Sequence, residues 1–270
     1  MKKYFITVDL EGVHGAVGEP YTGFIKSVSD YPKAIESVVL EINTAVSALF
    51  DGGADEVYVW DGHGGGNNFD PALIDPRAKQ IITSSVYSPQ RFDCLKEQNF
   101  NGVIFIGYHA REGTGGVLAH TYSSVHNQYI KINGVPYGEF ELDCCSIGAF
   151  GVPALFASAD DVALSQMQAF APEIVTVVTK YAKSRNSAIF REREEVLKDI
   201  YEGVQKAMLL RGKPRTFNYP CDFEIRYTRM EYAASQLQRI APKLPCVEYG
   251  EDLHVLKATI RDVNDLRLFF

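Results

Sequence analysis

Three apolar segments of the chain each end in residues that commonly bind metal ions. These residues are Asp9 and Glu11 after the first segment, Asp61 and His63 after the second, and His109 after the third. A set of carboxylates and imidazoles without thiolates suits Zn²⁺, with Mn²⁺ and Co²⁺ as alternatives. One such ending is weak evidence, but three of them on neighbouring strands predict a metal site.

The first segment, residues 4–12, predicts a buried β-strand that ends in two acids. Its β-branched and aromatic residues favour a strand, and Gly12 ends it. Side chains two positions apart on a strand point to the same side, so Asp9 and Glu11 are expected to face one point. Burying two like charges together is costly unless a cation neutralises them. The alternative is that both acids are solvated loop residues.

The histidines and Asp61 also have structural interpretations. His63 lies in a polar loop rich in Gly and Asn, where it could be solvated, and His109 could be a hydrogen-bonded core residue. Asp61 is either a turn residue or a residue that orients a ligating imidazole. The glycine run 64–66 lacks the Lys and Ser or Thr of a P-loop, so we expect it to give a substrate access instead.

The elements around these residues predict an α/β fold. Strands are expected over residues 4–12, 56–60, 102–107, 153–158 and 173–179, and helices over 33–50, 138–150 and 187–210. This alternation indicates a mostly parallel sheet with covering helices, a Rossmann-like three-layer core. In such sheets ligands bind beyond the carboxyl ends of the strands, which is where the acids and histidines lie.

The tail of the chain predicts a second, smaller lobe. Gly212 interrupts the helical pattern, and residues 212–270 then alternate short strands and helices. In the middle of the chain, Asn133 and Gly134 separate two strand-like segments and predict a hairpin. We therefore expect a metal-binding α/β catalytic domain over residues 1–211. The remaining α+β lobe is expected to pack on this domain and to take part in oligomerisation.

Composition narrows the class of protein. The chain has 270 residues, 46% of them hydrophobic, which supports a sizeable folded core. A net charge of −7 without a stripe of Lys and Arg argues against a nucleic-acid partner. No signal peptide is evident, and no apolar stretch is long enough for a membrane helix. Five scattered cysteines form no CxxC pair, which argues against a disulfide framework and favours a cytoplasmic location.

Several short motifs together resemble those of the D-aminopeptidase family, with matching order and spacing over roughly residues 1–160. The motifs are Asp-Leu-Glu-Gly at 9–12, Asp-Gly-His at 61–63 followed by Asn67 and Asn68, Gly-Tyr-His-Ala at 107–110, His120 after Gly-Gly-Val at 115–117, and Gly-Glu at 138–139. Any single motif is weak, but the set is specific. The chain departs from the family pattern at Gly62, at His14 and in the glycine run 64–66. These residues are expected near the substrate pocket, so the departures concern which peptides the protein prefers.

The resemblance implies a site with two Zn²⁺ ions per subunit. It places the metal ligands on Asp9, Glu11, His63, His109 and Glu139, and it makes Asp9 the bridge between the ions. The catalytic histidine of the family falls on His120. The resemblance also implies a homodecameric ring whose inner chamber holds the active sites.

Glu139 and His120 have alternatives of their own. Glu139 lies at the start of a predicted helix, where exposed N–H groups stabilise an acid, and Glu141 is a nearby competitor for the ligand role. His120 lies within residues 118–122, which could form a strand facing the site. It could also be a structural histidine.

The resulting hypothesis is a binuclear zinc aminopeptidase that hydrolyses short peptides through a metal-activated water. The resemblance favours an N-terminal D-amino acid, as in D-Ala-D-Ala, while the residues themselves leave D against L preference open. His120 would act as an acid or base, since a nucleophilic role is unnecessary. The alternatives are a metal-dependent amidase acting on a non-peptide substrate and a non-catalytic peptide-binding protein. The expected partners are a small peptide and further copies of the chain, without nucleic acid or membrane.

Overall fold

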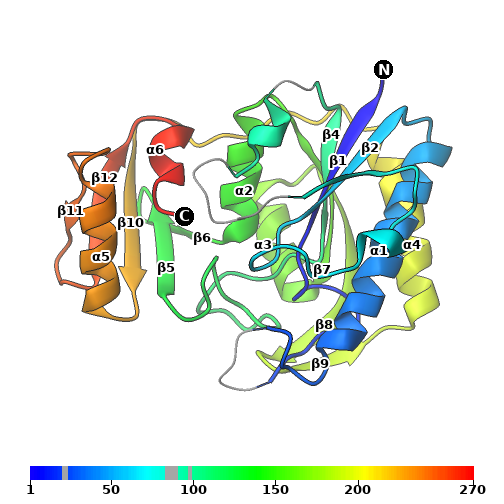
Figure 1. Cartoon of the computed structure of the whole chain (residues 1–270), viewed down its shortest axis with the longest axis horizontal. Helices are drawn as coiled ribbons and strands as arrows, with labels where there is room; N and C mark the ends of the chain where they lie inside the picture. The colour runs from blue at the N-terminus through cyan, green and yellow to red at the C-terminus, as the bar shows by residue number, and fades with distance from the viewer. Residues whose placement is uncertain (20–23, 83–90, 97–98) are drawn as a thin grey trace.

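The chain folds around two β-sheets in the computed structural model (Figure 1). The structure describes residues 1–19, 24–82, 91–96 and 99–270. The larger sheet has the order β3 (Lys79–Ile81), β2 (Glu56–Asp61), β1 (Lys3–Val8), β4 (Gly102–Ile106), β7 (Ala154–Asp160), β8 (Val175–Ser184) and β9 (Ser187–Phe190). Neighbouring strands from β3 to β8 are parallel, and β9 is antiparallel to β8. The mostly parallel sheet predicted from the sequence is confirmed.

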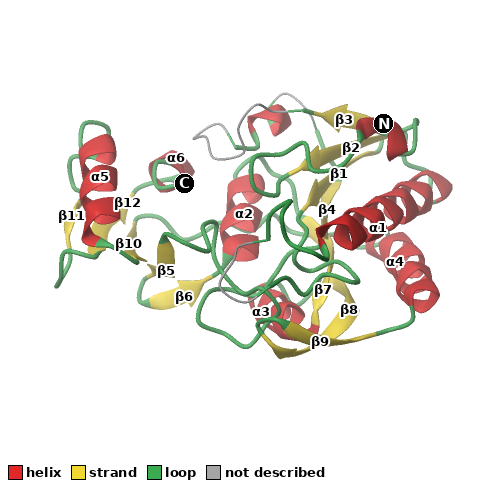
Figure 2. Cartoon of the chain, turned by 60° about the horizontal axis from the view of Figure 1, so that its bottom comes forward, coloured by secondary structure: helices red, strands yellow, loops and turns green. Residues whose placement is uncertain are grey.

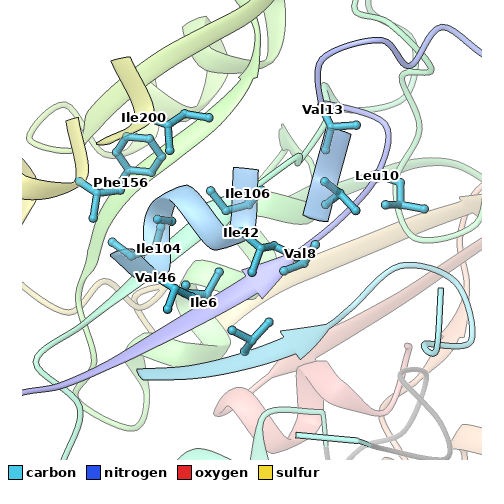
Figure 3. Close-up of a cluster of buried hydrophobic side chains, with 14 of the residues drawn as sticks. Ile6, Val8, Leu10, Val13, Ile42, Val46, Ile104, Ile106, Phe156 and Ile200 are labelled. Atoms are coloured by element: carbon cyan, nitrogen blue, oxygen red, sulfur yellow. The ribbon is translucent and has the colours of Figure 1, made fainter. Parts of the chain in front are cut away.

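Helices cover both faces of this sheet (Figure 2). The helices α1 (Tyr31–Asp51) and α4 (Arg193–Ala207) lie on one face, and α2 (Glu139–Gly148) and α3 (Asp161–Phe170) lie on the other. The strands are apolar on both sides because alternate side chains enter two separate cores. Ile6 and Val8 pack with Ile42 of α1 (Figure 3), whereas Phe5 enters the core on the other face, which includes Phe140 of α2. Within the described ranges, no helix has the length and apolar character needed to cross a bilayer.

The smaller sheet is antiparallel and combines two parts of the chain. Its order is β11 (Glu248–Tyr249), β12 (Val255–Ile260), β10 (Cys221–Tyr227), β5 (Asn127–Ile132) and β6 (Val135–Tyr137). The helices α5 (Met230–Ile240) and α6 (Val263–Arg267) belong to the same lobe. The predicted hairpin is confirmed, since Asn133 and Gly134 turn the chain between β5 and β6 with φ of 51° and 79°.

The hairpin extends the smaller lobe beyond the boundary expected from the sequence. β5 pairs with the edge of β10 that β12 leaves open. Ile130 and Ile132 of β5 enter the same core as Phe223 of β10. The smaller lobe therefore takes in residues 127–137 as well as the tail of the chain. Its part in oligomerisation stays a prediction.

One predicted helix begins later than expected. Residues 187–190 form β9 and not the first turn of the helix, and α4 begins at Arg193. The segment Ser-Ala-Ile-Phe pairs with β8 across a tight turn at Arg185 and Asn186. Pairing with an available strand edge outweighs the helical spacing of its apolar residues, because β-branched and aromatic side chains suit a pleated surface.

Candidate metal centre

The predicted ligands converge because three strands end together at one edge of the larger sheet. Val8 at the end of β1 pairs with Asp61 of β2 on one side and with Ile106 of β4 on the other. The chain therefore leaves all three strands at the same level. The six predicted site residues meet there, and none exposes more than 9% of its surface. They are Asp9, Glu11, His63, His109, His120 and Glu139.

Asp9, Glu11 and His63 form the first of two groups of candidate ligands. Nδ1 of His63 lies 2.8 Å from Oδ1 of Asp9 and 3.1 Å from Oε2 of Glu11. All three side chains are buried. The acids predicted to face one point do so, and an imidazole nitrogen lies at that point.

A loop, and not the strand, brings the two acids together. β1 ends before Asp9 and Glu11, so the expected strand geometry does not apply to them. The loop passes close over the end of β4, where the amide of Gly12 donates to the carbonyl of Gly107 at 2.7 Å. A Cβ on Gly12 would overlap the carbonyl oxygen of Tyr108. Glycine is required at this position because the two backbones touch.

His109, His120 and Glu139 form the second group. Nε2 of His109 lies 3.5 Å from Oε2 of Glu139 and 3.4 Å from Oδ2 of Asp9. The Asp9 carboxylate is thus divided, since its Oδ1 faces His63 in the first group and its Oδ2 faces His109 in the second. In each group the candidate ligand atoms lie within 4.8 Å of one another. Each group thus offers three candidate ligands for a cation, and Asp9 lies between the two groups.

Backbone carbonyls determine which nitrogen each imidazole presents to the centre. These contacts join Nε2 of His63 to Phe24 at 2.8 Å, Nδ1 of His109 to Ala110 at 3.0 Å, and Nδ1 of His120 to Leu118 at 2.8 Å. A carbonyl oxygen only accepts, so each of these nitrogens carries a hydrogen and donates it. His63 therefore presents Nδ1 to the centre, and the other two histidines present Nε2. Fixing the far nitrogen in this way is typical of metal-binding histidines.

The buried carboxylates of the centre are stable only when positive charge balances them. Burial opposes ionisation of Asp9, but the hydrogen bond with His63 and the charges of His109 and His63 together outweigh burial, and the pKa of Asp9 is lowered. Burial also opposes protonation of His63, yet Glu11 and Asp9 raise its pKa well above the usual value. At His109, the nearby carboxylates of Glu139 and Asp9 overcome burial and raise the pKa to about 10. Protonated imidazoles balance the charge of these carboxylates when no metal is bound, and a divalent cation would serve the same purpose.

One buried atom fits a metal ion directly. Among the residues that the structure describes, Nε2 of His109 has no hydrogen-bond partner, although it is enclosed beside Asp9 and Glu139. A buried nitrogen lone pair that faces carboxylates is unfavourable unless a proton or a cation lies between them. The carboxylates and imidazoles, without a thiolate, form a donor set that suits zinc. The residues present therefore fit the predicted ion.

Glu141, and not Glu139, caps helix α2. Oε2 of Glu141 accepts a hydrogen bond from the amide of Gly138 at 2.8 Å, as in a capping box. Glu139 turns toward His109 and accepts a hydrogen bond from the amide of Tyr122 at 2.9 Å. The two acids therefore have separate tasks, and Glu141 does not compete for the centre.

Asp61 shapes the loop that carries His63. Its carboxylate accepts hydrogen bonds from the amide of Asn68 at 2.6 Å and from Nδ2 of Asn68 at 3.0 Å. It meets His63 through the backbone amide, at 3.3 Å, while the imidazole is held by the carbonyl of Phe24. Asp61 is therefore a turn residue, and it does not orient the imidazole of His63.

His120 reaches the centre from a turn. The predicted strand around it does not form, because Leu118 and Tyr122 have positive φ values of 52° and 56° that an extended strand excludes. The ring of His120 stacks on that of His109 with centroids 3.9 Å apart. Its Nε2 lies 3.9 Å from Oε1 of Glu11, so the ring borders both groups.

A buried network behind Glu139 was not predicted. Asp143 accepts hydrogen bonds from Nη2 of Arg91 at 2.6 Å and from the hydroxyls of Tyr108 and Tyr122, each at 2.8 Å. Nη2 of Arg91 also lies 3.5 Å from Oε1 of Glu139. The sequence holds one signal for this network, since acids at 139 and 143 are four residues apart and share one face of a helix.

Comparisons with known proteins agree with this geometry. The peptidase family M55 profile, described as D-aminopeptidase, matches residues 1–264. A D-aminopeptidase of Bacillus subtilis (strain 168) is 30% identical over 186 residues, which cover 68% of this chain and 66% of that protein, just under two thirds of its length. The solved structure of the Zn-dependent D-aminopeptidase DppA from Bacillus subtilis, a self-compartmentalizing protease, has the same fold. It is 24% identical, with a TM-score of 0.84 over 98% of this chain and 94% of that chain.

Proposed function

The chain belongs to the D-aminopeptidase family, and from this membership we propose that it is a zinc-dependent aminopeptidase that hydrolyses short peptides. The proposed centre holds two zinc ions in each subunit. Its ligands are Asp9, Glu11, His63, His109 and Glu139, with Asp9 as the bridge. The observation that carries this proposal is the divided carboxylate of Asp9, whose two oxygens face histidines of different groups.

His120 is proposed to transfer protons during the reaction. When bound, zinc would lower the pKa of a water molecule and polarise the scissile carbonyl. Nδ1 of His120 donates to the carbonyl of Leu118, which leaves Nε2 free to accept a proton on the side of the centre. Burial and the positive charge of His109 lower the pKa of His120, so its ring is neutral at neutral pH. It can therefore take a proton at Nε2 and deliver it to the leaving amine.

The proposed substrate and assembly follow the similar proteins. We take short peptides with an N-terminal D-amino acid, such as D-Ala-D-Ala, as the substrate, because both similar Bacillus subtilis proteins are D-aminopeptidases. One of them is self-compartmentalizing, which supports a homo-oligomer for this chain, and we take a decameric ring as its form. All five cysteines are free thiols, which supports the cytoplasm as the location. Mn²⁺ and Co²⁺ stay alternatives to zinc.

Metal analysis and a peptide assay of the purified protein test this function. We expect about two zinc ions per subunit, as in two-metal hydrolases. We also expect release of D-Ala from D-Ala-D-Ala that is faster than release of L-Ala from L-Ala-L-Ala. The substitution Asp9→Ala should abolish both zinc binding and hydrolysis, whereas Glu36→Ala, which removes an exposed acid of α1, should change neither. Hydrolysis that survives intact in Asp9→Ala would refute the metal mechanism.

Two other results would support the alternatives. Zinc-loaded protein that cleaves non-peptide amides but no dipeptide would be an amidase. Tight dipeptide binding in calorimetry, without turnover in zinc-replete protein, would indicate a binding protein.

A further inference from the structure

A buried lysine holds the loop that carries Asp9 and Glu11. Lys180 of β8 has no exposed surface, although lysine is almost never fully buried. Its Nζ donates hydrogen bonds to three carbonyl oxygens, those of Glu11 at 2.6 Å, Val13 at 2.7 Å and Ala16 at 2.6 Å. An ammonium group has three donors, and here each donor has an acceptor in the same loop.

A bulge in the sheet directs two consecutive residues of β8 at this loop. The register between β7 and β8 shifts next to Asp160, which pairs with Lys180. Consecutive side chains of a regular strand point to opposite faces. Here the hydroxyl of Thr179 donates to the carbonyl of Gly12 at 2.6 Å, beside the contacts of Lys180. Bulges commonly redirect side chains near functional sites, and this one directs two donors to one loop.

The loop backbone is therefore fixed on both sides of the two acids. Before them, the amide of Asp9 donates to the carbonyl of Ile106 at 2.8 Å. After them, Lys180 and Thr179 hold the carbonyls of Glu11 and Gly12. The two carboxylates extend from a backbone that cannot shift without breaking these bonds. An apolar side chain in place of Lys180 would leave three carbonyls without this donor, which is unfavourable in a buried loop.

We infer that Lys180 is a positioning residue for the metal centre, which holds the Asp9 and Glu11 carboxylates in place for zinc to bind. This inference rests on the proposed zinc function. The lysine does not touch zinc or substrate, and it acts through the loop backbone. Residues that orient metal ligands in this way typically change metal affinity by about 10- to 100-fold when they are removed.

The substitution Lys180→Met tests this role, with Lys183→Met as the matched control. Methionine has a similar length but no donor, and Lys183 is an exposed lysine of the same strand. Zinc affinity, measured by competition with a chelator, should weaken by about 10- to 100-fold in Lys180→Met. The kcat of zinc-saturated enzyme should fall, while KM for the dipeptide changes little. Lys183→Met should match the wild type in all three quantities.

A milder variant separates positioning from fold stability. Lys180→Gln keeps two N–H donors, so its zinc affinity should lie between those of Lys180→Met and the wild type. A merely structural role would lower the unfolding midpoint of both variants and leave zinc affinity and kcat of the folded protein unchanged, and this result would overturn the inference. Failure of both variants to fold would also assign Lys180 to stability alone. Wild-type protein that binds zinc but cleaves no peptide would contradict the proposed function, while the zinc affinities would still decide the role of Lys180.

Discussion

The imidazole rings of His109 and His120 are stacked, with centroids 3.9 Å apart and planes inclined by 11°. Two adjacent rings cannot both carry a positive charge without strong repulsion. Contacts with Glu139 and Asp9 favour charge on His109, whereas burial and the charge of His109 lower the pKa of His120. In the stacked pair, His109 therefore carries the positive charge and His120 is neutral.

Because a neutral His120 can accept a proton, His120→Ala should lower the rate of turnover and keep its bound zinc. The kcat should fall by about 100- to 10,000-fold, the usual range for a general acid or base. The zinc content should stay unchanged, and His126→Ala, which removes an exposed histidine, should behave like the wild type. Dipeptide hydrolysis and metal analysis of the same samples measure both effects. A parallel loss of zinc would make His120 a ligand and contradict its assignment as acid or base.

The divided carboxylate of Asp9 predicts that two acid-to-amide substitutions differ in zinc content. Asp9→Asn removes a charge that both groups share, so both zinc ions should be lost. Glu11→Gln affects the group of His63, because Glu11 lies 3.1 Å from that imidazole, so one zinc ion should remain. Metal analysis after dialysis against a weak chelator gives the two values. Equal zinc contents in the two variants would contradict a bridging role for Asp9.

The strand order of the larger sheet explains why part of the centre was predictable. Parallel strands of a sheet end at a common edge, so polar residues after residues 8, 60 and 106 had to meet there. The pairing of β5 with β10 was not predictable in the same way. It joins Ile130 to Ile225, far apart in sequence, and neither segment alone indicates its partner.

The finer geometry of the centre depends on contacts that no local pattern encodes. Asp9 and Glu11 were expected on a strand, but a close approach of Gly12 to Gly107 places them in a loop. Lys180 comes directly after the strand predicted over residues 173–179, and only a bulge between β7 and β8 turns it inward. Such features arise from tertiary packing, which outweighs strand propensity and alternation.

Removal of the Asp143 carboxylate should strongly destabilise the fold. Asp143→Ala would remove the buried carboxylate that accepts hydrogen bonds from the guanidinium of Arg91 and from the hydroxyls of Tyr108 and Tyr122. Breaking a buried ion pair in this way typically costs about 3–5 kcal/mol. The free energy of unfolding from urea titrations of metal-free protein measures the loss. Glu36→Ala, which breaks the exposed pair with Arg193, is the control and should change little. A loss in Asp143→Ala no larger than in this control would contradict the network.

A buried acid of α1, Glu41, predicts that the free energy of unfolding falls as pH rises. Glu41 accepts hydrogen bonds from the amide of His14 at 2.8 Å and from the hydroxyl of Ser158 at 3.4 Å. Burial raises its pKa from 4.5 to about 7, although these bonds and the charge of Lys180 oppose the shift. Between these two values the folded state keeps a proton that the unfolded state has lost. The contribution of Glu41 is therefore complete below pH 4.5 and is lost as pH rises toward 7.

Glu41→Gln should remove this part of the pH dependence. A shift from 4.5 to about 7 corresponds to about 3 kcal/mol, so the wild type should lose up to about that much more stability than the variant over this interval. The measurement is the free energy of unfolding of metal-free protein at a series of pH values between these limits. Using the difference between the two proteins cancels the titration of the histidines, which both share. Above pH 7 the two curves should run parallel, and parallel curves from pH 5 upward would show that Glu41 is already ionised in the folded protein.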